Sequence, residues 1–256
     1  MAETVLVTGA SSGIGLELAR CFARAGANLI LVARTERKLQ ELAAAAASEF
    51  HVTAGVIPCD LSRPDAAAAI AAEIERRGQA VDVLVNNAGF GDRGAFAERD
   101  VDRQLSMIQV NVTSLTHLTR LLLPGMLARG RGGVLNVAST AAFQPGPNMA
   151  VYYATKAYVL SFSEALVEEV GQTGVTISCL APGPTDTGFA AEANLLETRL
   201  FKLGTMSAAE VASAGYGGFR NRKALVVPGL RNQLGAFAVR LAPRAMARKI
   251  TAGLQA

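Results

Sequence analysis

Short apolar runs alternate along the chain with longer stretches in which apolar residues recur every three to four positions. The runs Thr4–Thr8, Asn28–Ala33, Val52–Ile57 and Val81–Val85 have the length and aliphatic composition of buried strands. The stretches between them have helical periodicity, and no linker-like tract interrupts the alternation. This pattern predicts a single α/β domain over residues 1–256, with helices on both faces of a parallel, doubly wound sheet.

Composition excludes several classes of protein. The first strand begins within five residues of Met1, so we expect no signal peptide, and no apolar run approaches the roughly 20 residues that span a bilayer. Cys21, Cys59 and Cys179 are an odd, scattered set that matches neither a disulfide framework nor a metal-binding spacing. Basic and aromatic residues are not interleaved as in nucleic-acid-binding proteins. We therefore predict a cytoplasmic protein that binds neither a metal nor nucleic acid.

Positive charge is concentrated in the last quarter of the chain. Residues 199–256 carry a net charge of +9, whereas the preceding residues carry −5. A basic helical extension is predicted over 229–256, interrupted at Pro243. It would pack on its own domain or on a sister subunit, the interpretation we favour, or dock on an anionic membrane surface or an acidic partner. Its apolar positions are Leu230, Leu234, Phe237 and Leu241, and its basic face contains Arg240, Arg244 and Arg248.

A glycine-rich loop, Gly9-Ala10-Ser11-Ser12-Gly13-Ile14-Gly15, joins the first predicted strand to the first predicted helix. Glycines let the backbone turn tightly and approach a phosphate, and a helix start presents free N–H groups to negative charge. The spacing G-x-x-x-G-x-G differs from the common dinucleotide fingerprint G-x-G-x-x-G. We predict that this loop binds the phosphates of a dinucleotide.

The same loop contains G-x-S-x-G centred on Ser11, the pattern of the nucleophile elbow in serine hydrolases. That chemistry needs a downstream histidine, and the chain has only His51 and His117. We expect His51 on the surface at the start of a strand and His117 within a long helix. The elbow would also follow the first strand, whereas the hydrolase fold places several strands before it. The hydrolase alternative is therefore disfavoured.

The end of the second predicted strand indicates which dinucleotide is bound. An acidic residue there would bind the ribose 2′-hydroxyl of NAD, whereas arginine suits the 2′-phosphate of NADP. The strand ends in Ala33 and is followed by Arg34, and Arg37 and Lys38 add positive charge at the start of the next helix. Glu36 could reach the ribose instead. We predict NADP(H), with NAD(H) as the less favoured alternative.

Tyr152 and Lys156 are spaced to share one face of a helix, thirteen residues after Ser139. An ammonium group beside a phenol favours the phenolate, so we expect Lys156 to lower the pKa of Tyr152 from its ordinary value of about 10. The Ser139 hydroxyl could hold a substrate oxygen. Phenol, ammonium and hydroxyl together suit the proton transfer of a carbonyl/alcohol interconversion.

These motifs together resemble the short-chain dehydrogenase/reductase family over nearly the whole chain. The resemblance implies a Rossmann fold with seven strands in the order 3-2-1-4-5-6-7, and a homodimer or homotetramer. The motifs, in chain order, are Thr8-Gly9-x-x-x-Gly13-x-Gly15, Asp60-Leu61, Asn86-Asn87-Ala88-Gly89, Asn111, Ser139, Tyr152-x-x-x-Lys156 and Pro182-Gly183.

The resemblance also implies a role for each matching residue. Asn111 would hold a water in a proton relay, Ser139 would position the substrate oxygen, and Tyr152 would be the acid/base. Lys156 would lower the pKa of the tyrosine and bind the nicotinamide ribose, and Asp60 would contact the adenine. The implied cofactor-binding residues are Gly9, Ser11, Ser12, Gly13, Ile14, Gly15, Arg34, Lys38, Asp60, Leu61, Asn87, Ala88, Gly89, Tyr152, Lys156, Pro182, Gly183, Thr185 and Thr187.

Residues 187–206 lie where the family places its substrate lid. Their large apolar residues favour an apolar substrate, although an ordinary amphipathic helix packed on the domain would show the same pattern. We predict an NADP-dependent oxidoreductase acting on a carbonyl or secondary alcohol. A 3-oxoacyl thioester reductase and an NADP-sensing protein without turnover are the alternatives. The apolar residues are Phe189, Leu195, Leu196, Leu200, Phe201, Leu203 and Met206.

Overall fold

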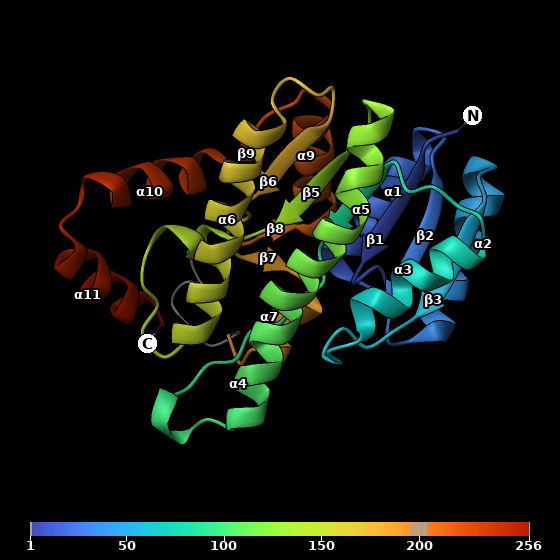
Figure 1. Ribbon diagram of the computed structural model, residues 1–256. Coiled ribbons are helices and arrows are strands. Elements are labelled where there is room, and N and C mark those ends of the chain that lie inside the picture. Colours follow the sequence, from blue (N-terminus) through green and yellow to red (C-terminus); the bar gives the residue numbers. More distant parts are fainter. Residues whose placement is uncertain (1, 196–197, 199–200, 202–203, 256) are drawn as a thin grey trace.

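A parallel sheet of seven strands forms the centre of the molecule in the computed structural model (Figure 1). The structure describes residues 2–195, 198, 201 and 204–255. The strand order β3-β2-β1-β4-β5-β6-β9 confirms the predicted topology, with β9 as the seventh strand. Short strands β7 (Thr185–Asp186) and β8 (Met206–Ser207) pair in a separate sheet. The central strands are β1 (Thr4–Thr8), β2 (Asn28–Ala33), β3 (Ala54–Pro58), β4 (Val83–Asn86), β5 (Gly133–Val137), β6 (Thr176–Leu180) and β9 (Leu225–Val226).

Helices cover both faces of this sheet, as predicted (Figure 1). One face packs on α1 (Gly13–Arg24), α2 (Glu36–Phe50) and α9 (Ala208–Arg220). The opposite face packs on α3 (Ala66–Arg76), α5 (Leu115–Arg129) and α6 (Ala150–Val170). The remaining helices are α4 (Val101–Ile108), α7 (Gly188–Glu192), α10 (Leu230–Leu241) and α11 (Arg244–Gln255), with short turns η1 (Phe96–Glu98), η2 (Gln109–Ser114) and η3 (Thr140–Phe143).

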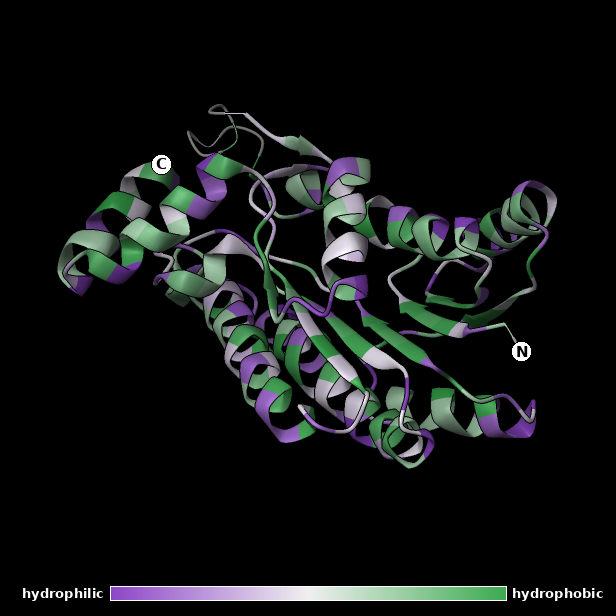
Figure 2. Ribbon diagram, turned by 90° about the horizontal axis from the view of Figure 1, so that it is seen from above, coloured by the Kyte–Doolittle hydropathy of each residue, from purple (hydrophilic) through white to green (hydrophobic). Residues whose placement is uncertain are grey.

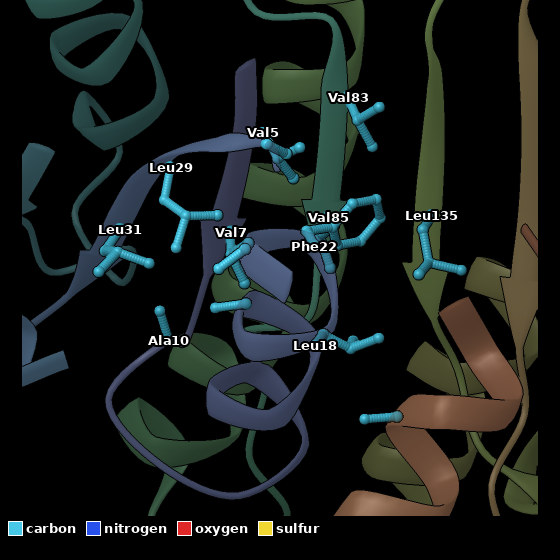
Figure 3. Close-up of a cluster of buried hydrophobic side chains, with 14 of the residues drawn as sticks. Val5, Val7, Ala10, Leu18, Phe22, Leu29, Leu31, Val83, Val85 and Leu135 are labelled. Carbon is cyan, nitrogen blue, oxygen red and sulfur yellow. The ribbon is translucent and has the colours of Figure 1, made fainter. Parts of the chain in front are cut away.

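Alternate residues of β1 belong to different cores, because successive side chains of a strand point to opposite faces. Val5 and Val7 pack with Phe22 of α1 on one face, whereas Leu6 packs on the other (Figure 3). Phe22 is fully buried, and burial of such a side chain contributes about 1.5–3 kcal/mol. Strands buried on both faces read as continuous apolar runs, which is why the pattern of β1 and β2 predicted their bounds correctly.

The prediction was less accurate at the edge of the sheet. The third strand is Ala54–Pro58, two residues later at its start than predicted and one later at its end. Pro58 is tolerated because β3 is an edge strand and pairs with β2 alone among the described strands. The fourth strand is Val83–Asn86, so Val81 precedes it although its side chain is buried.

The C-terminal extension consists of α10 and α11, separated at Pro243 as predicted. Both helices lie beyond α6, away from the centre of the sheet (Figures 1 and 2). The apolar positions Leu230, Leu234, Phe237 and Leu241 are 60–74% exposed. The described residues of its own domain therefore do not cover this face, and a sister subunit, an anionic membrane surface and an acidic partner remain as the predicted alternatives. Within the described residues, no helix is long and apolar enough to cross a membrane.

Candidate active site

A cavity of about 630 Å³ lies at the carboxyl ends of the parallel strands. Open α/β sheets bind ligands at this edge, because strand ends, loops and helix N-termini converge there. Arg34 and Asp60 line one part of the cavity, and Ser139, Tyr152 and Lys156 line another. Among the predicted site residues, Gly15, Lys38 and Asn111 are not in the described lining, and all the others are.

The glycine loop is held tightly against the residues that follow β4. Gly9 and Gly13 have φ values of +65° and +55°, in the left-handed region that favours glycine. Asn87 Nδ2 donates to the carbonyl oxygens of Thr8 at 2.9 Å and Gly9 at 3.2 Å. A Cβ atom on Gly15 would lie 2.3 Å from Asn87 Nδ2 and 2.4 Å from the Gly9 oxygen. Gly15 is therefore needed for packing of α1 against the loop, and its predicted contact with the cofactor stays a prediction.

The N-terminus of α1 fits a phosphate group. Ser12 precedes the helix, and its side chain makes no capping hydrogen bond with any described residue. The first N–H groups of a helix lack partners within the helix and carry partial positive charge. Ser11, Ser12 and Gly13 line the cavity at this point. The cradle therefore fits a dinucleotide, which supplies or accepts hydride when it is bound.

Arg34 and Asp60 stand together at the end of the cavity beyond β2 and β3. Ser62 N donates to Asp60 Oδ1 at 3.0 Å, and this hydrogen bond, helped by the nearby Arg34 guanidinium, lowers the pKa of Asp60. Lys38 is exposed on α2 and lies outside the described lining, so its predicted contact with the cofactor is not supported. Glu36 accepts a hydrogen bond from Gln40 along α2 at 2.9 Å and is also outside that lining.

The Asn86–Gly89 segment is fixed to its neighbouring strands. Thr8 Oγ1 accepts from the backbone N–H groups of Asn87 and Ala88, each at 3.0 Å. Asn86 Nδ2 donates to Asn136 Oδ1 at 2.9 Å, which links β4 to β5. These hydrogen bonds therefore fix Asn87, Ala88 and Gly89, which line the cavity, between the glycine loop and β5.

Tyr152 and Lys156 lie on the first turns of α6, beside Ser139 at the end of β5. Both side chains are buried, with 8% and 5% exposure. The Lys156 ammonium donates to the Val137 carbonyl oxygen at 2.8 Å and lies 5.9 Å from the centroid of the Tyr152 ring. The helical spacing does bring the two side chains together, but the ammonium is directed to the backbone of β5.

The pKa of Tyr152 is raised, contrary to the prediction. Burial removes water from the phenolate and outweighs the hydrogen bond with Ser139, which acts to lower the pKa. Lys156 does not reverse this balance, because its ammonium is itself desolvated and bonded to Val137. Tyr152 is therefore a neutral phenol near neutral pH, and in this state it can donate a proton to a developing alkoxide.

We expect Lys156→Met to stabilise the fold by about 1–3 kcal/mol at pH 7, a few degrees in Tm. Burial lowers the pKa of Lys156 from 10.5 to about 8. Between these values the unfolded chain holds a proton that the folded chain releases, so wild-type stability rises with pH. The gain of the variant should therefore shrink as pH rises from 8 to 10.5, as measured by thermal unfolding.

Lys38→Met is the matched control, because Lys38 is exposed on α2. It should leave the unfolding temperature unchanged at every pH. A Lys156→Met protein that is less stable than wild type at pH 7 would contradict the prediction, and would mean that the hydrogen bond to Val137 outweighs the cost of burial.

Asn111 lies in a π-helical turn, Gln109–Ser114, between α4 and α5. Its Nδ2 donates to the Phe90 carbonyl and to Thr155 Oγ1, both at 3.1 Å, and its Oδ1 accepts from Phe90 N at 3.1 Å. The side chain thus ties the segment after β4 to α6. π-Turns interrupt the regular hydrogen-bond ladder and are frequent at functional sites. Because both amide hydrogens are donated, a relay water would have to bind Asn111 Oδ1 or the main chain of this turn.

Sequence reasoning missed part of the cavity wall. Local sequence patterns predicted helices, but they do not indicate which elements, distant along the chain, form the cavity wall together. Of the predicted lid residues, Phe189, Leu195 and Phe201 line the cavity, and Met206 packs against the core cluster to which α1 and α9 contribute. Leu196, Leu200 and Leu203 lie outside the described residues. The lining residues that were not predicted include Phe90, Met149, Tyr153, Thr251, Leu254 and Gln255.

The positions of the two histidines contradict the hydrolase alternative. Ser11 lines the cavity, but neither His51 nor His117 is in its described lining. His51 follows α2 with φ +56° and is exposed, and His117 lies within α5. No histidine base is therefore available to Ser11. The described residues also contain no group of three or more His, Cys, Asp or Glu side chains placed to hold a metal ion.

Comparison with known proteins shows the family to which the chain belongs. The family model for the short chain dehydrogenase matches residues 3–197. A Streptomyces coelicolor protein named "Putative ketoacyl reductase" is 41% identical over 196 residues, which cover 74% of this chain and 73% of the relative. The chain therefore belongs to the short chain dehydrogenase family of oxidoreductases.

Two solved structures are similar over almost the whole chain. A short-chain dehydrogenase from Sphingobium yanoikuyae in complex with NADPH has a TM-score of 0.85 and 32% identity, with 95% of this chain and 94% of that chain covered. The bulky-bulky ketone specific alcohol dehydrogenase from Comamonas testosteroni has a TM-score of 0.78 and 31% identity, with 93% of each chain covered. The NADPH in the first of these structures supports a nicotinamide cofactor.

Proposed function

We propose that this protein is an NADP(H)-dependent oxidoreductase that interconverts an apolar ketone and its secondary alcohol. The proposal rests on which side chains line a single cavity. Its wall brings the Tyr152 phenol, the Ser139 hydroxyl and the Lys156 ammonium to one region, and an uncapped helix N-terminus and Arg34 to another. The first set suits proton transfer to a carbonyl oxygen, and the second suits a phosphorylated dinucleotide.

In the direction of reduction, bound NADPH would supply a hydride to the carbonyl carbon. Tyr152 gives its phenolic proton to the carbonyl oxygen as negative charge develops there, and the neutral state favoured by burial makes it ready to do so. Ser139 donates a hydrogen bond to the same oxygen. Lys156 stabilises the tyrosinate that is left, and the π-turn at Asn111 holds a water through which the proton is replaced. The products are the alcohol and NADP⁺.

NADP(H) as the cofactor is supported by Arg34, the basic side chain that lines the cavity beyond β2. A guanidinium pairs in a bidentate manner with phosphate oxygens and so suits the 2′-phosphate. The similar structure from Sphingobium yanoikuyae contains NADPH.

An apolar ketone as the substrate is supported by the side chains around Tyr152. The Phe189 ring lies 5.4 Å from the Tyr152 ring, centroid to centroid. Met149, Ala190 and Leu195 are buried in the same apolar cluster. The relative from Comamonas testosteroni, by its name, acts on bulky-bulky ketones. We also propose a homo-oligomer, supported by the exposed apolar residues of α4 and α10, and a cytoplasmic location.

The test is consumption of NADPH by the wild-type protein with a panel of aryl and alicyclic ketones. We expect turnover that depends on the ketone and falls when NADH replaces NADPH. A second candidate, reduction of 3-oxoacyl thioesters, is favoured by relatives named ketoacyl reductases. Preference for an acetoacetyl thioester over every simple ketone would select it. Tight NADPH binding without turnover of any carbonyl would instead indicate a cofactor-sensing protein.

A further inference from the structure

The last helix of the chain returns to the cavity. Thr251, Leu254 and Gln255, all in the final turns of α11, are part of the cavity wall. The match to the family model ends at residue 197, so α11 lies outside the part of the chain that the model covers. In Figure 1 the C-terminus lies near the first turns of α6, which carry Tyr152 and Tyr153.

Hydrogen bonds to both the side chain and the backbone of Gln255 fix the end of α11 beside Tyr152. Gln255 Nε2 donates to the Tyr153 hydroxyl at 2.6 Å, and Arg93 Nε donates to the Gln255 carbonyl oxygen at 3.0 Å. Gln255 is 1% exposed and Tyr153 is 5% exposed, so water competes little for these bonds. The rings of Tyr153 and Tyr152 are 6.0 Å apart, centroid to centroid. Tyr153 therefore connects the end of α11 to Tyr152, the proposed proton donor.

The residues of α11 that line the cavity, Thr251, Leu254 and Gln255, carry no charge that could bind a charged substrate. Thr251 Oγ1 donates to the Ala247 carbonyl within the helix at 2.9 Å. The Arg93 guanidinium donates to the Gln255 carbonyl and keeps its positive charge, but Arg93 is not in the described cavity lining. Burial raises the pKa of Tyr153, which is therefore a neutral phenol. Leu254 is the large apolar side chain that the final turn contributes to the cavity.

A charged substrate group would find no free counter-charge at this end of the described cavity. Arg103 and Glu192, which also line the cavity, pair with each other at 4.0 Å, and Arg103 pairs with Asp92 at 3.4 Å. Asp92 in turn accepts a bidentate pair from Arg99 at 2.7 and 2.6 Å. Burial of an unpaired carboxylate or ammonium is strongly unfavourable. The wall therefore suits an uncharged, apolar group.

We propose that the final turn of α11 is the wall of a substrate subsite, and that Leu254 sets how large an uncharged apolar substituent the ketone can carry. This inference rests on the proposed function, because it describes the substrate side of the same site. Gln255, through its bond to Tyr153, is the positioning residue that keeps Leu254 in place. The size of one side chain on α11 therefore determines substrate preference, whereas the chemistry remains with Tyr152.

The proposal is tested by changing Leu254 in both directions. The measured quantity is the ratio of kcat/KM for 2-acetylnaphthalene to kcat/KM for acetophenone, with NADPH as the cofactor. We expect Leu254→Ala to raise this ratio about tenfold and Leu254→Trp to lower it about tenfold, since one or two methylenes in an apolar pocket change discrimination by this order. The KM for NADPH should stay within about twofold in both variants, because the wall is remote from Arg34.

Ile250→Ala and Ile250→Trp are the matched controls. Ile250 lies on the same helix one turn earlier, is 54% exposed, and is not in the described cavity lining. Its substitutions should leave the ratio unchanged. A ratio that stays constant in both Leu254 variants, or that moves equally in the Ile250 variants, would overturn the proposal.

The dissociation constants of both ketones for the NADPH complex of Tyr152→Phe, alone and combined with each Leu254 substitution, give the same ratio without turnover. This second measurement separates the two hypotheses. A wild-type protein that reduces neither ketone counts against the proposed function. A binding ratio that does not respond to Leu254 counts against the subsite wall.

Discussion

Replacement of Tyr152 by phenylalanine is expected to lower kcat for ketone reduction by about 10²- to 10⁴-fold. The substitution removes the phenolic oxygen alone, so the proton donor is lost while the ring remains packed against Phe189 and Tyr153. Ser139 can still hydrogen-bond the substrate oxygen, which is why some activity should remain. The measurement is the steady-state rate of NADPH consumption with the best ketone of the panel.

Tyr158→Phe is the control on the same helix. The Tyr158 hydroxyl bonds to Thr116 Oγ1 at 3.0 Å, and the residue is 40% exposed and outside the described cavity lining. This variant should keep its activity within about twofold. Tyr152→Phe should bind NADPH as wild type does, as followed by fluorescence titration. If it kept more than a tenth of wild-type kcat, Tyr152 would not be the proton donor.

The second large effect is expected for Arg34→Ala, which should lower kcat/KM for NADPH by about 10- to 100-fold. Charge-assisted bonds to a phosphate are among the stronger polar contacts, and about 1.5–3 kcal/mol is lost with each. Because NADH has no 2′-phosphate, its kcat/KM should change less than about twofold. The NADPH:NADH preference, measured by steady-state kinetics, should therefore collapse.

Arg37→Ala provides the comparison. Arg37 is three residues further along, pairs with Glu41 at 2.5 Å, and its side chain is 76% exposed. It should leave the NADPH:NADH preference unchanged. If Arg34→Ala also left the NADPH:NADH preference unchanged, Arg34 would not bind the 2′-phosphate. NAD(H) would then have to be considered as the cofactor.

The fold was predictable where a signal is local. β1 and β2 have their predicted bounds, and a capping box of Ser207 and Glu210, three residues apart in the sequence, begins α9. The Ser207 hydroxyl accepts from Glu210 N at 3.2 Å, and Glu210 Oε2 accepts from Ser207 N at 2.9 Å. Such contacts involve residues only three positions apart, so their geometry follows from the backbone of a single turn.

The meeting of the three proposed catalytic side chains was predictable, but their pKa values were not. Motif order indicated that Ser139, Tyr152 and Lys156 belong together, and the cavity contains all three. The pKa of Tyr152 was predicted in the wrong direction, because desolvation depends on how many distant elements cover the phenol. Lys38 was assigned to the cofactor from its nearness to Arg34 along the chain, but α2 carries it onto an exposed surface.

By itself, the sequence determined the alternation of strands and helices, the glycine turn and the helical register that brings Tyr152 and Lys156 together. Each depends on spacing within one or two turns of chain. The tertiary structure alone decided that the Lys156 ammonium binds Val137 and that α11 returns to place Leu254 and Gln255 in the cavity. Gln255 and Tyr153 are 102 residues apart. No local preference encodes such a contact, because it forms only when the packing of the intervening elements brings the two side chains together.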